Sequence, residues 1–164
     1  MTDNITHLAQ LLGNKLTVNG WQITCAESCT GGGVGYAITS IAGSSAWFQK
    51  GFITYSNEAK QAMLDVSQHT LIQHGAVSAE TVEEMASGAA NKAGAEIAIS
   101  ISGIAGPGGG TPDKPVGTVW FGYFIKGLVV SQKQQFNGSR QEIREKAIQF
   151  ALSHVLTLLA KQPN

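Results

Sequence analysis

Two nucleophilic side chains precede a run of glycines near the start of the sequence. The stretch TCAESCTGGGVGYAI places Ser28 and Cys29 before the glycines at 31–33, where an apolar segment gives way to a helical pattern. The first N–H groups of a helix are unpaired and carry the positive end of its dipole, which suits a phosphate or a developing oxyanion. Ser28 or Thr30 could equally be a plain helix cap, and the residues alone leave both interpretations open.

This glycine turn lacks the spacing of the common phosphate and nucleophile motifs. It contains no G-x-x-x-x-G-K-[ST], and Tyr36 stands where G-x-G-x-x-G needs its last glycine. Ala26 and Thr30 occupy the glycine positions of a G-x-S-x-G elbow. Any chemistry at this turn therefore depends on its backbone geometry.

Tyr55 and Lys60 form a second group of reactive side chains. The segment TYSNEAK places Tyr55 at a strand end and Lys60 in the first turn of the next helix. The helix dipole disfavours an ammonium group there, so Lys60 would lose its proton more readily. A neutral lysine can act as the base for a serine hydroxyl, with Tyr55 orienting it or donating a proton. A solvated lysine and a tyrosine with a satisfied hydroxyl are the plainer alternative.

Arg140 and Arg144 are the only arginines in the chain and stand one turn apart at the start of the last helix. Cations there are unfavourable by about 0.3–1 kcal/mol, and two at this spacing also repel each other. An anion such as a phosphate would reverse this cost. Neutralisation by Glu142 and Glu145 in a surface network is the alternative.

The histidines give little support for a metal site. His7, His69, His74 and His154 are scattered and show no H-x-x-x-H spacing, and C-x-x-C is absent as well, so we assign no metal. A Ser-His-Asp triad that uses His74 and Asp65 stays open, because triads assemble in space rather than in sequence.

Composition narrows the class of protein. The 164 residues are 43% hydrophobic and 13% charged, which suits one globular domain over residues 1–164. Zero net charge without a Lys/Arg run argues against nucleic-acid binding.

No apolar run approaches the roughly 18 residues that span a bilayer, and the start MTDNITHLAQLL lacks a signal-peptide pattern. We therefore expect no membrane association and a cytoplasmic location. Cys25 and Cys29 are expected to be free thiols.

Apolar periodicity and turn residues divide the chain into alternating helices and strands. We expect helices over 4–18, 31–42 and 57–66, from Ser78 to about Ala93, and from a Ser139/Glu142 capping box to about Ala160. We expect strands in WQITCA, GFITYS and EIAISIS, and a hairpin formed by VGTVWFGYFI and LVVSQKQQF. This order predicts a three-layer α/β/α fold whose mixed sheet includes an antiparallel hairpin. In such sheets ligands bind beyond the carboxyl ends of the strands.

Four longer segments carry a resemblance to a known family. AESCTGG, GSSAWFQKGFITYSNEAK, HGAVS and SGIAGPGGGTPDKPVGTVWFG together resemble the CinA C-terminal domain family, from about residue 5 to residue 160. The resemblance implies hydrolysis of the carboxamide of nicotinamide mononucleotide (NMN), which yields nicotinic acid mononucleotide and ammonia and serves NAD recycling. It implies no cofactor.

The resemblance also implies a serine nucleophile, carried onto Ser28, with Tyr55 and Lys60 as its partners. In this mechanism Lys60 takes the Ser28 proton, and backbone N–H groups near Thr30–Gly32 hold the oxyanion. Arg140, Arg144 and the Gly103–Gly110 loop are candidates for the substrate phosphate. The expected substrate-binding residues are Thr30, Gly31, Gly32, Ser102, Gly103, Ala105, Gly106, Arg140 and Arg144.

Two alternatives remain at this stage. Cys29 could be the nucleophile, because a thiol at a helix N-terminus is acidified. The domain could also be a non-catalytic nucleotide-binding or competence-associated interaction module, which an exposed apolar face would favour. We further expect a homo-oligomer and assume a dimer.

Overall fold

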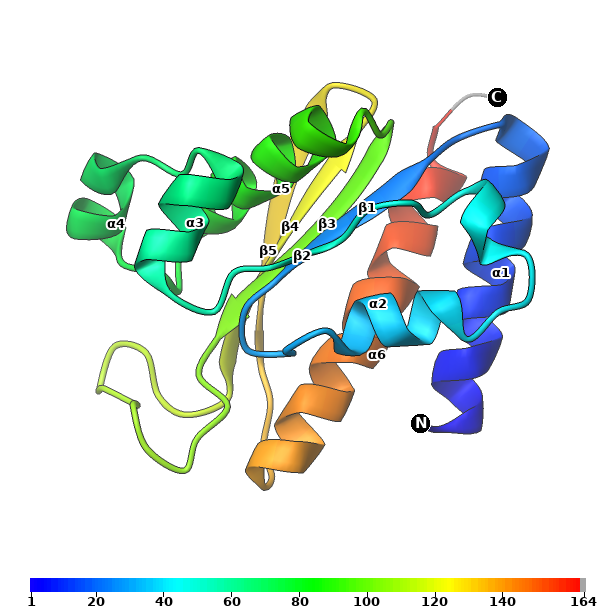
Figure 1. The fold of residues 1–164 in the computed structure, drawn as a ribbon. Coiled ribbons are helices and arrows are strands. Elements are labelled where there is room, and N and C mark those ends of the chain that lie inside the picture. The colour runs from blue at the N-terminus through cyan, green and yellow to red at the C-terminus, as the bar shows by residue number, and fades with distance from the viewer. Residues whose placement is uncertain (163–164) are drawn as a thin grey trace.

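A five-stranded sheet lies between two groups of helices in the computed structural model, which describes residues 1–162 (Figure 1). The strand order is β2-β1-β3-β4-β5. Three parallel strands, β2 (Phe52–Ile53), β1 (Ile23–Glu27) and β3 (Ile97–Gly103), continue into an antiparallel hairpin of β4 (Thr118–Ile125) and β5 (Leu128–Gln135). The predicted mixed sheet with its hairpin is therefore confirmed.

Helices cover both faces of this sheet, as the three-layer prediction requires. One face carries α1 (Asp3–Asn19), α2 (Gly33–Thr39) and α6 (Arg140–Ala160), and the other carries α3 (Asn57–Leu64), α4 (Gln68–His74) and α5 (Ala79–Ala93) (Figure 1). A short 3₁₀ turn, η1 (Ser44–Ala46), follows α2. Each helical layer buries its own hydrophobic cluster against the sheet. None of the helices in the described range is long and apolar enough to cross a bilayer.

Serine caps fix where the helices around the site begin. The Ser56 hydroxyl accepts a hydrogen bond from the third residue of α3, and Ser78 does the same at α5. At α6 the Ser139 hydroxyl and the Glu142 carboxylate form a reciprocal capping box. These starts agree with the sequence prediction, because S-x-x-E and serine before an apolar pattern are local signals.

Three elements are shorter than predicted, and one helix was not predicted. The second strand was expected over 51–56, but β2 has two residues because it pairs only with the end of β1. Helix α3 was expected to reach residue 66 and ends at Leu64, since Asp65 adopts a left-handed φ of 59°. The helix expected over 31–42 is reduced to α2, and the short helix α4 was not predicted.

Close packing between α3 and α5 determines the position of α3. A Cβ atom on Gly88 of α5 would collide with the carbonyl oxygen of Leu64, the last residue of α3. Only glycine lets the α3 backbone approach so closely. The contact sets the depth at which α3, and with it Lys60, sits against the sheet.

Candidate active site

Most predicted site residues lie at one edge of the sheet. Because β1, β2 and β3 are parallel, their carboxyl ends meet at the same edge, where each continues into a loop. The turn at 28–32 follows β1, Thr54 and Tyr55 follow β2, and a long loop follows β3. The first turn of α6 reaches the same edge from the other side, at the bottom of Figure 1.

Ser28 and Lys60 are in direct contact. Lys60 Nζ lies 3.0 Å from Ser28 Oγ and 3.1 Å from the carbonyl oxygen of Thr54, although Ser28 and Lys60 are 32 positions apart in sequence. The Lys60 residue is 1% exposed and Ser28 is 8% exposed. Lys60 is therefore not the solvated surface lysine of the plainer interpretation.

The surroundings of Lys60 disfavour its charged form. Burial lowers the pKa of the amine from its usual value of 10.5, opposed only in part by the nearby Cys29. Among residues 1–162 no carboxylate forms an ion pair with this amine. A neutral Lys60 can donate one hydrogen to the Thr54 carbonyl and accept the Ser28 hydroxyl hydrogen. This is the arrangement that a general base requires.

Glu27, a residue that the sequence analysis did not single out, caps α2. Its Oε1 accepts hydrogen bonds from Val34 N at 2.8 Å and Thr30 Oγ1 at 2.6 Å, and its Oε2 accepts one from Gly35 N at 2.9 Å. The N-cap residue is Gly32, which has no side-chain cap. The alternative interpretation, in which Ser28 or Thr30 caps this helix, is therefore wrong, because the Glu27 carboxylate accepts the N–H groups that such a cap would bind.

Three N–H groups in the turn have no hydrogen-bond acceptor within the described residues. Gly31 N donates to the Ser28 carbonyl and Gly33 N to the Thr30 carbonyl, whereas the N–H groups of Cys29, Thr30 and Gly32 have no partner. Thr30 and Gly32 lie in the segment expected to hold an oxyanion, and Gly31 between them does not contribute a free donor.

Cys29 differs chemically from its neighbour Ser28. Burial raises the pKa of the Cys29 thiol to about 12, the opposite of the acidification that a thiolate nucleophile needs. The side chain belongs to the hydrophobic cluster on the α6 side of the sheet. Cys25 is also buried and free, so both cysteines are free thiols as expected.

Tyr55 and Arg140 contact each other across the edge of the sheet. Arg140 donates to the Tyr55 hydroxyl at 2.9 Å and to the Gly106 carbonyl at 2.8 Å. Tyr55 is 61% exposed and makes no hydrogen bond to Lys60 or Ser28 in the described part of the chain. Arg140 thus links the loops after β2 and β3.

Arg144 contacts the turn at 28–32, which we call the nucleophile turn after the role predicted for Ser28. Its Nε donates to the Cys29 carbonyl at 3.1 Å and its guanidinium to the Thr30 carbonyl at 3.3 Å. Neither arginine pairs with a carboxylate among residues 1–162, and Glu142 is bound in the capping box instead. The surface network with Glu142 and Glu145 is therefore absent, and both guanidinium groups keep unused donors.

An open cleft of about 670 Å³ runs between the glycine turn and α6. Its lining comprises Thr30, Gly31, Gly32, Gly33, Tyr36, Ile53, Gln141, Arg144, Glu145 and Ile148. The cleft combines one cation, Arg144, and one carboxylate, Glu145, with backbone and apolar walls, and it lies beside the turn without including Ser28 or Lys60.

The remaining predicted residues lie on or just after β3. Ser102 and Ala105 are buried, Gly103 ends the strand, and Gly106 contributes the carbonyl that Arg140 binds. His74 and Asp65 pair with Glu80 and Lys92, so neither completes a triad with Ser28. No group of three metal-ligating side chains occurs in the part of the chain that is described.

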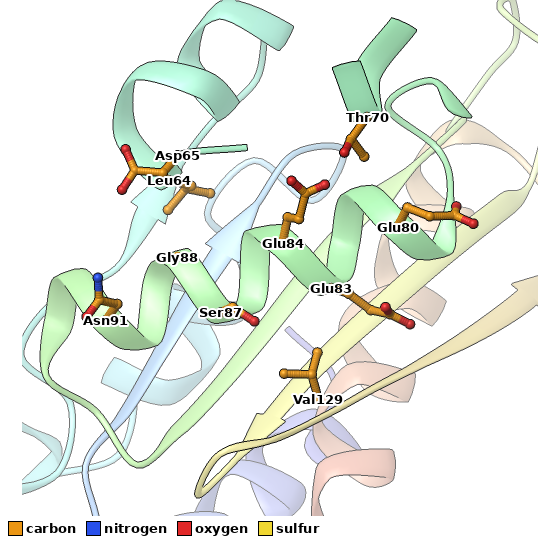
Figure 2. A pocket seen from close by; sticks show the side chains of 10 residues that line it. All are labelled: Leu64, Asp65, Thr70, Glu80, Glu83, Glu84, Ser87, Gly88, Asn91 and Val129. Atoms are coloured by element: carbon orange, nitrogen blue, oxygen red, sulfur yellow. The ribbon is translucent and has the colours of Figure 1, made fainter. Parts of the chain in front are cut away.

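A second cavity, of about 710 Å³, lies on the opposite side of the molecule over α5 (Figure 2). Four carboxylates line it, but each has a partner within the protein: Asp65 pairs with Lys92, Glu80 with His74, Glu83 with the Ser131 hydroxyl, and Glu84 with the Ser67 N–H. Two ion pairs and two hydrogen bonds thus connect α5 to its neighbours. We assign no function to this cavity.

Curated relatives and solved structures match most of this chain. The chain is 57% identical to a nicotinamide-nucleotide amidohydrolase PncC of Enterobacter agglomerans, over 88% of this chain and 89% of that one. It is 52% identical to the protein of the same name from Escherichia coli K12, over 93% of both chains. A crystal structure titled competence damage-inducible protein A from Klebsiella pneumoniae superposes with a TM-score of 0.95 at 39% identity, covering 98% of this chain and 100% of that one.

Longer proteins share the same region. A CinA-like protein of Kosmotoga olearia is 50% identical over 90% of this chain, which corresponds to 36% of that protein. The model of the CinA C-terminal domain matches residues 5–159, nearly the extent that the sequence resemblance indicated. The chain therefore belongs to the CinA C-terminal domain family.

Proposed function

We propose that this protein hydrolyses the carboxamide of nicotinamide mononucleotide to nicotinic acid mononucleotide and ammonia. The observation that carries the proposal is the buried contact between Lys60 Nζ and Ser28 Oγ at 3.0 Å. The relatives named nicotinamide-nucleotide amidohydrolase, at 48–57% identity, support the choice of substrate. The linear amide makes the reaction an acyl transfer to water.

In the first half of the reaction, Ser28 Oγ attacks the amide carbon and its proton passes to neutral Lys60. The amide oxygen becomes an oxyanion, for which the unpaired N–H groups of Thr30 and Gly32 are the candidate donors. The C–N bond then breaks. Protonated Lys60 returns its proton to the departing nitrogen, so ammonia leaves and an acyl-serine ester remains.

In the second half, Lys60 is neutral again and accepts a proton from water. The resulting hydroxide equivalent attacks the ester carbon, the C–O bond to Ser28 breaks, and Lys60 returns the proton to Ser28 Oγ. Both half-reactions use the same base and the same oxyanion donors. No cofactor enters either step.

The substrate phosphate needs a positively charged partner, and Arg140 and Arg144 remain our candidates. Both stand at the start of α6 without a carboxylate partner in the described residues. Arg144 lines the cleft beside the glycine turn, and Arg140 reaches the loop after β3. Their spare donors can bind phosphate oxygens in a charge-assisted way. The N-terminus of α2 offers fewer free N–H groups to a phosphate, because Val34 N and Gly35 N already donate to Glu27.

The direct test is ammonia release from nicotinamide mononucleotide by the purified protein, measured in a coupled assay with Ser28→Ala as the control. We expect release by the wild type and none by the variant. Binding of the nucleotide without ammonia release would instead support a non-catalytic nucleotide-binding module.

A further inference from the structure

The carboxylate of Glu27 is enclosed beside the proposed nucleophile. The residue is 1% exposed and ends β1, directly before Ser28. Besides its bonds to Thr30, Val34 and Gly35, its Oε2 lies 3.6 Å from Cys25 Sγ. No lysine or arginine pairs with it in residues 1–162. The carboxylate is therefore held by hydrogen-bond donors alone, and most of these belong to the segment that follows Ser28.

These bonds hold both ends of the nucleophile turn with one side chain. Thr30 lies two residues after Ser28, and Val34 and Gly35 form the first turn of α2. Between them Gly31 and Gly32 adopt positive φ angles of 59° and 102°, conformations available to glycine at little cost. A glycine-rich turn of this kind is flexible unless its flanks are fixed. Glu27 provides that fixation from within the core.

The same bonds determine which backbone donors stay free. A short helix start normally leaves its first N–H groups open to any anion. Here Glu27 takes those of Val34 and Gly35, while the N–H groups of Cys29, Thr30 and Gly32 have no partner in the described chain. The free donors are thus restricted to the segment next to Ser28 Oγ.

We propose that Glu27 is a positioning residue for the amide hydrolysis: its carboxylate fixes the turn so that Ser28 Oγ and the N–H groups of Thr30 and Gly32 are held in the geometry of the tetrahedral intermediate. This inference rests on the proposed function. Glu27 does not touch the reacting atoms, and it transfers no proton. It acts on the transition state, in which the oxyanion exists, more than on the bound substrate.

The test compares Glu27→Gln with a matched control. A glutamine keeps one carbonyl oxygen for Thr30 and Val34 but turns an amide N–H₂ toward Gly35 N, which replaces an acceptor with a donor. The control is Glu96→Gln, since the Glu96 carboxylate also accepts a backbone N–H, from Gln22 at 2.7 Å, but at the opposite end of the strands. Both variants replace a carboxylate that accepts a backbone N–H, but only Glu27 uses both of its oxygens as acceptors and lies beside Ser28.

We expect Glu27→Gln to lower kcat on the order of 10²-fold, the scale of losing one oxyanion donor, with KM within about threefold of the wild type. Glu96→Gln should keep the wild-type kcat. The pH dependence of kcat in Glu27→Gln should keep the wild-type midpoint, because Lys60 remains the base. A kcat equal to that of Glu96→Gln, or a rise in KM alone, would overturn the proposal.

Thr30→Val supplies a second variant in case Glu27→Gln does not fold. It removes the hydroxyl that donates to Glu27 Oε1 and leaves the backbone N–H in place. We expect kcat to fall by up to about tenfold at unchanged KM, and an unchanged kcat would count against the role of Glu27. Ammonia release by the wild type is measured first. Its absence contradicts the proposed function, whereas an active wild type with an equally active Glu27→Gln contradicts only this inference.

Discussion

Ser28 and Cys29 are neighbours in sequence and differ in what their surroundings let them do. Ser28 Oγ contacts a buried amine, whereas the Cys29 thiol has a pKa of about 12 and is protonated at neutral pH. We therefore expect Ser28→Ala to abolish ammonia release with the fold intact, since the Ser28 N–H bond to the Ile101 carbonyl does not involve the side chain. Cys29→Ala should keep most of the activity. Activity in Ser28→Ala combined with its loss in Cys29→Ala would make the thiol the nucleophile.

Lys60 is expected to set the pH dependence of the reaction. The base must be neutral to accept the Ser28 proton, so kcat/KM falls as pH drops below the Lys60 pKa and levels off above it. Because burial lowers that pKa, the midpoint of this limb should lie below pH 10.5. Lys60→Met should lose on the order of 10²-fold or more in kcat and lose this pH limb. The measurement is a kcat/KM profile across the neutral and alkaline range, and a normal rate for Lys60→Met at neutral pH would exclude the assignment.

At the scale of elements, the start of α6 connects the loops that form the site. Arg140 reaches Tyr55 and the loop after β3, and Arg144 reaches the turn after β1. The sequence analysis assigned both arginines the same role, the recognition of phosphate. The contacts now separate them, because only Arg144 also supports the nucleophile turn.

We expect Arg140→Gln and Arg144→Gln each to lower kcat/KM for nicotinamide mononucleotide by about 10- to 150-fold, the scale of a charge-assisted contact. The corresponding nucleoside, which lacks the phosphate, should be a poor substrate and nearly indifferent to Arg140→Gln. Arg144→Gln should slow the nucleoside as well, since the bonds to the Cys29 and Thr30 carbonyls are lost for both substrates.

The comparison needs kcat/KM for both substrates with the wild type and both variants. Equal losses on nucleotide and nucleoside for Arg140→Gln would show that Arg140 supports structure only. Tyr55→Phe serves as a further control, because it removes the hydroxyl that Arg140 binds and keeps the ring. It should be impaired less severely than Lys60→Met.

At the scale of the whole molecule, the buried amine links stability to pH. The unfolded chain keeps the Lys60 proton up to about pH 10.5, and the folded chain releases it at lower pH. In the window between the two pKa values the unfolded state binds more protons, so the free energy of unfolding rises with pH there. Below the window the contribution is unfavourable and constant.

The expected result is a difference between the pH dependences of two unfolding free energies. The unfolding free energy of the wild type, relative to Lys60→Met, should increase as pH rises toward 10.5, since the methionine variant has no proton to release. Denaturant unfolding of both proteins at several pH values measures it. Parallel curves over the alkaline range would show that the amine is as well solvated in the folded chain as in the unfolded one.

The parts of this structure that local patterns encode could be predicted from the sequence. The β4–β5 hairpin, the Ser139 capping box and the placement of Lys60 in a first helical turn all follow from residues a few positions apart. The resemblance to the family supplied the pairing of Ser28 with Lys60, and the residues alone left it open.

The remaining features depend on contacts between distant segments. The burial of Lys60 follows from the approach of α3 to α5 at Gly88, and no periodicity in the α3 segment indicates it. The Glu27 cap was missed because the acceptor lies in the strand before the helix, outside the S-x-x-E spacing. The length of β2 was misjudged because an apolar run does not reveal how far its neighbour extends.

The contacts of Arg140 and Arg144 also have a consequence for the order of folding. Ser28 and Lys60 are separated by 32 positions, Arg140 and Tyr55 by 85, and Arg144 and Cys29 by 115. Contacts between residues farther apart in sequence cost more chain entropy to close. A chain emerging from the ribosome can bring Ser28 and Lys60 together well before α6 exists, and Glu27 can already bind the turn, but the Arg144 bonds to the turn form only after the last helix has been made.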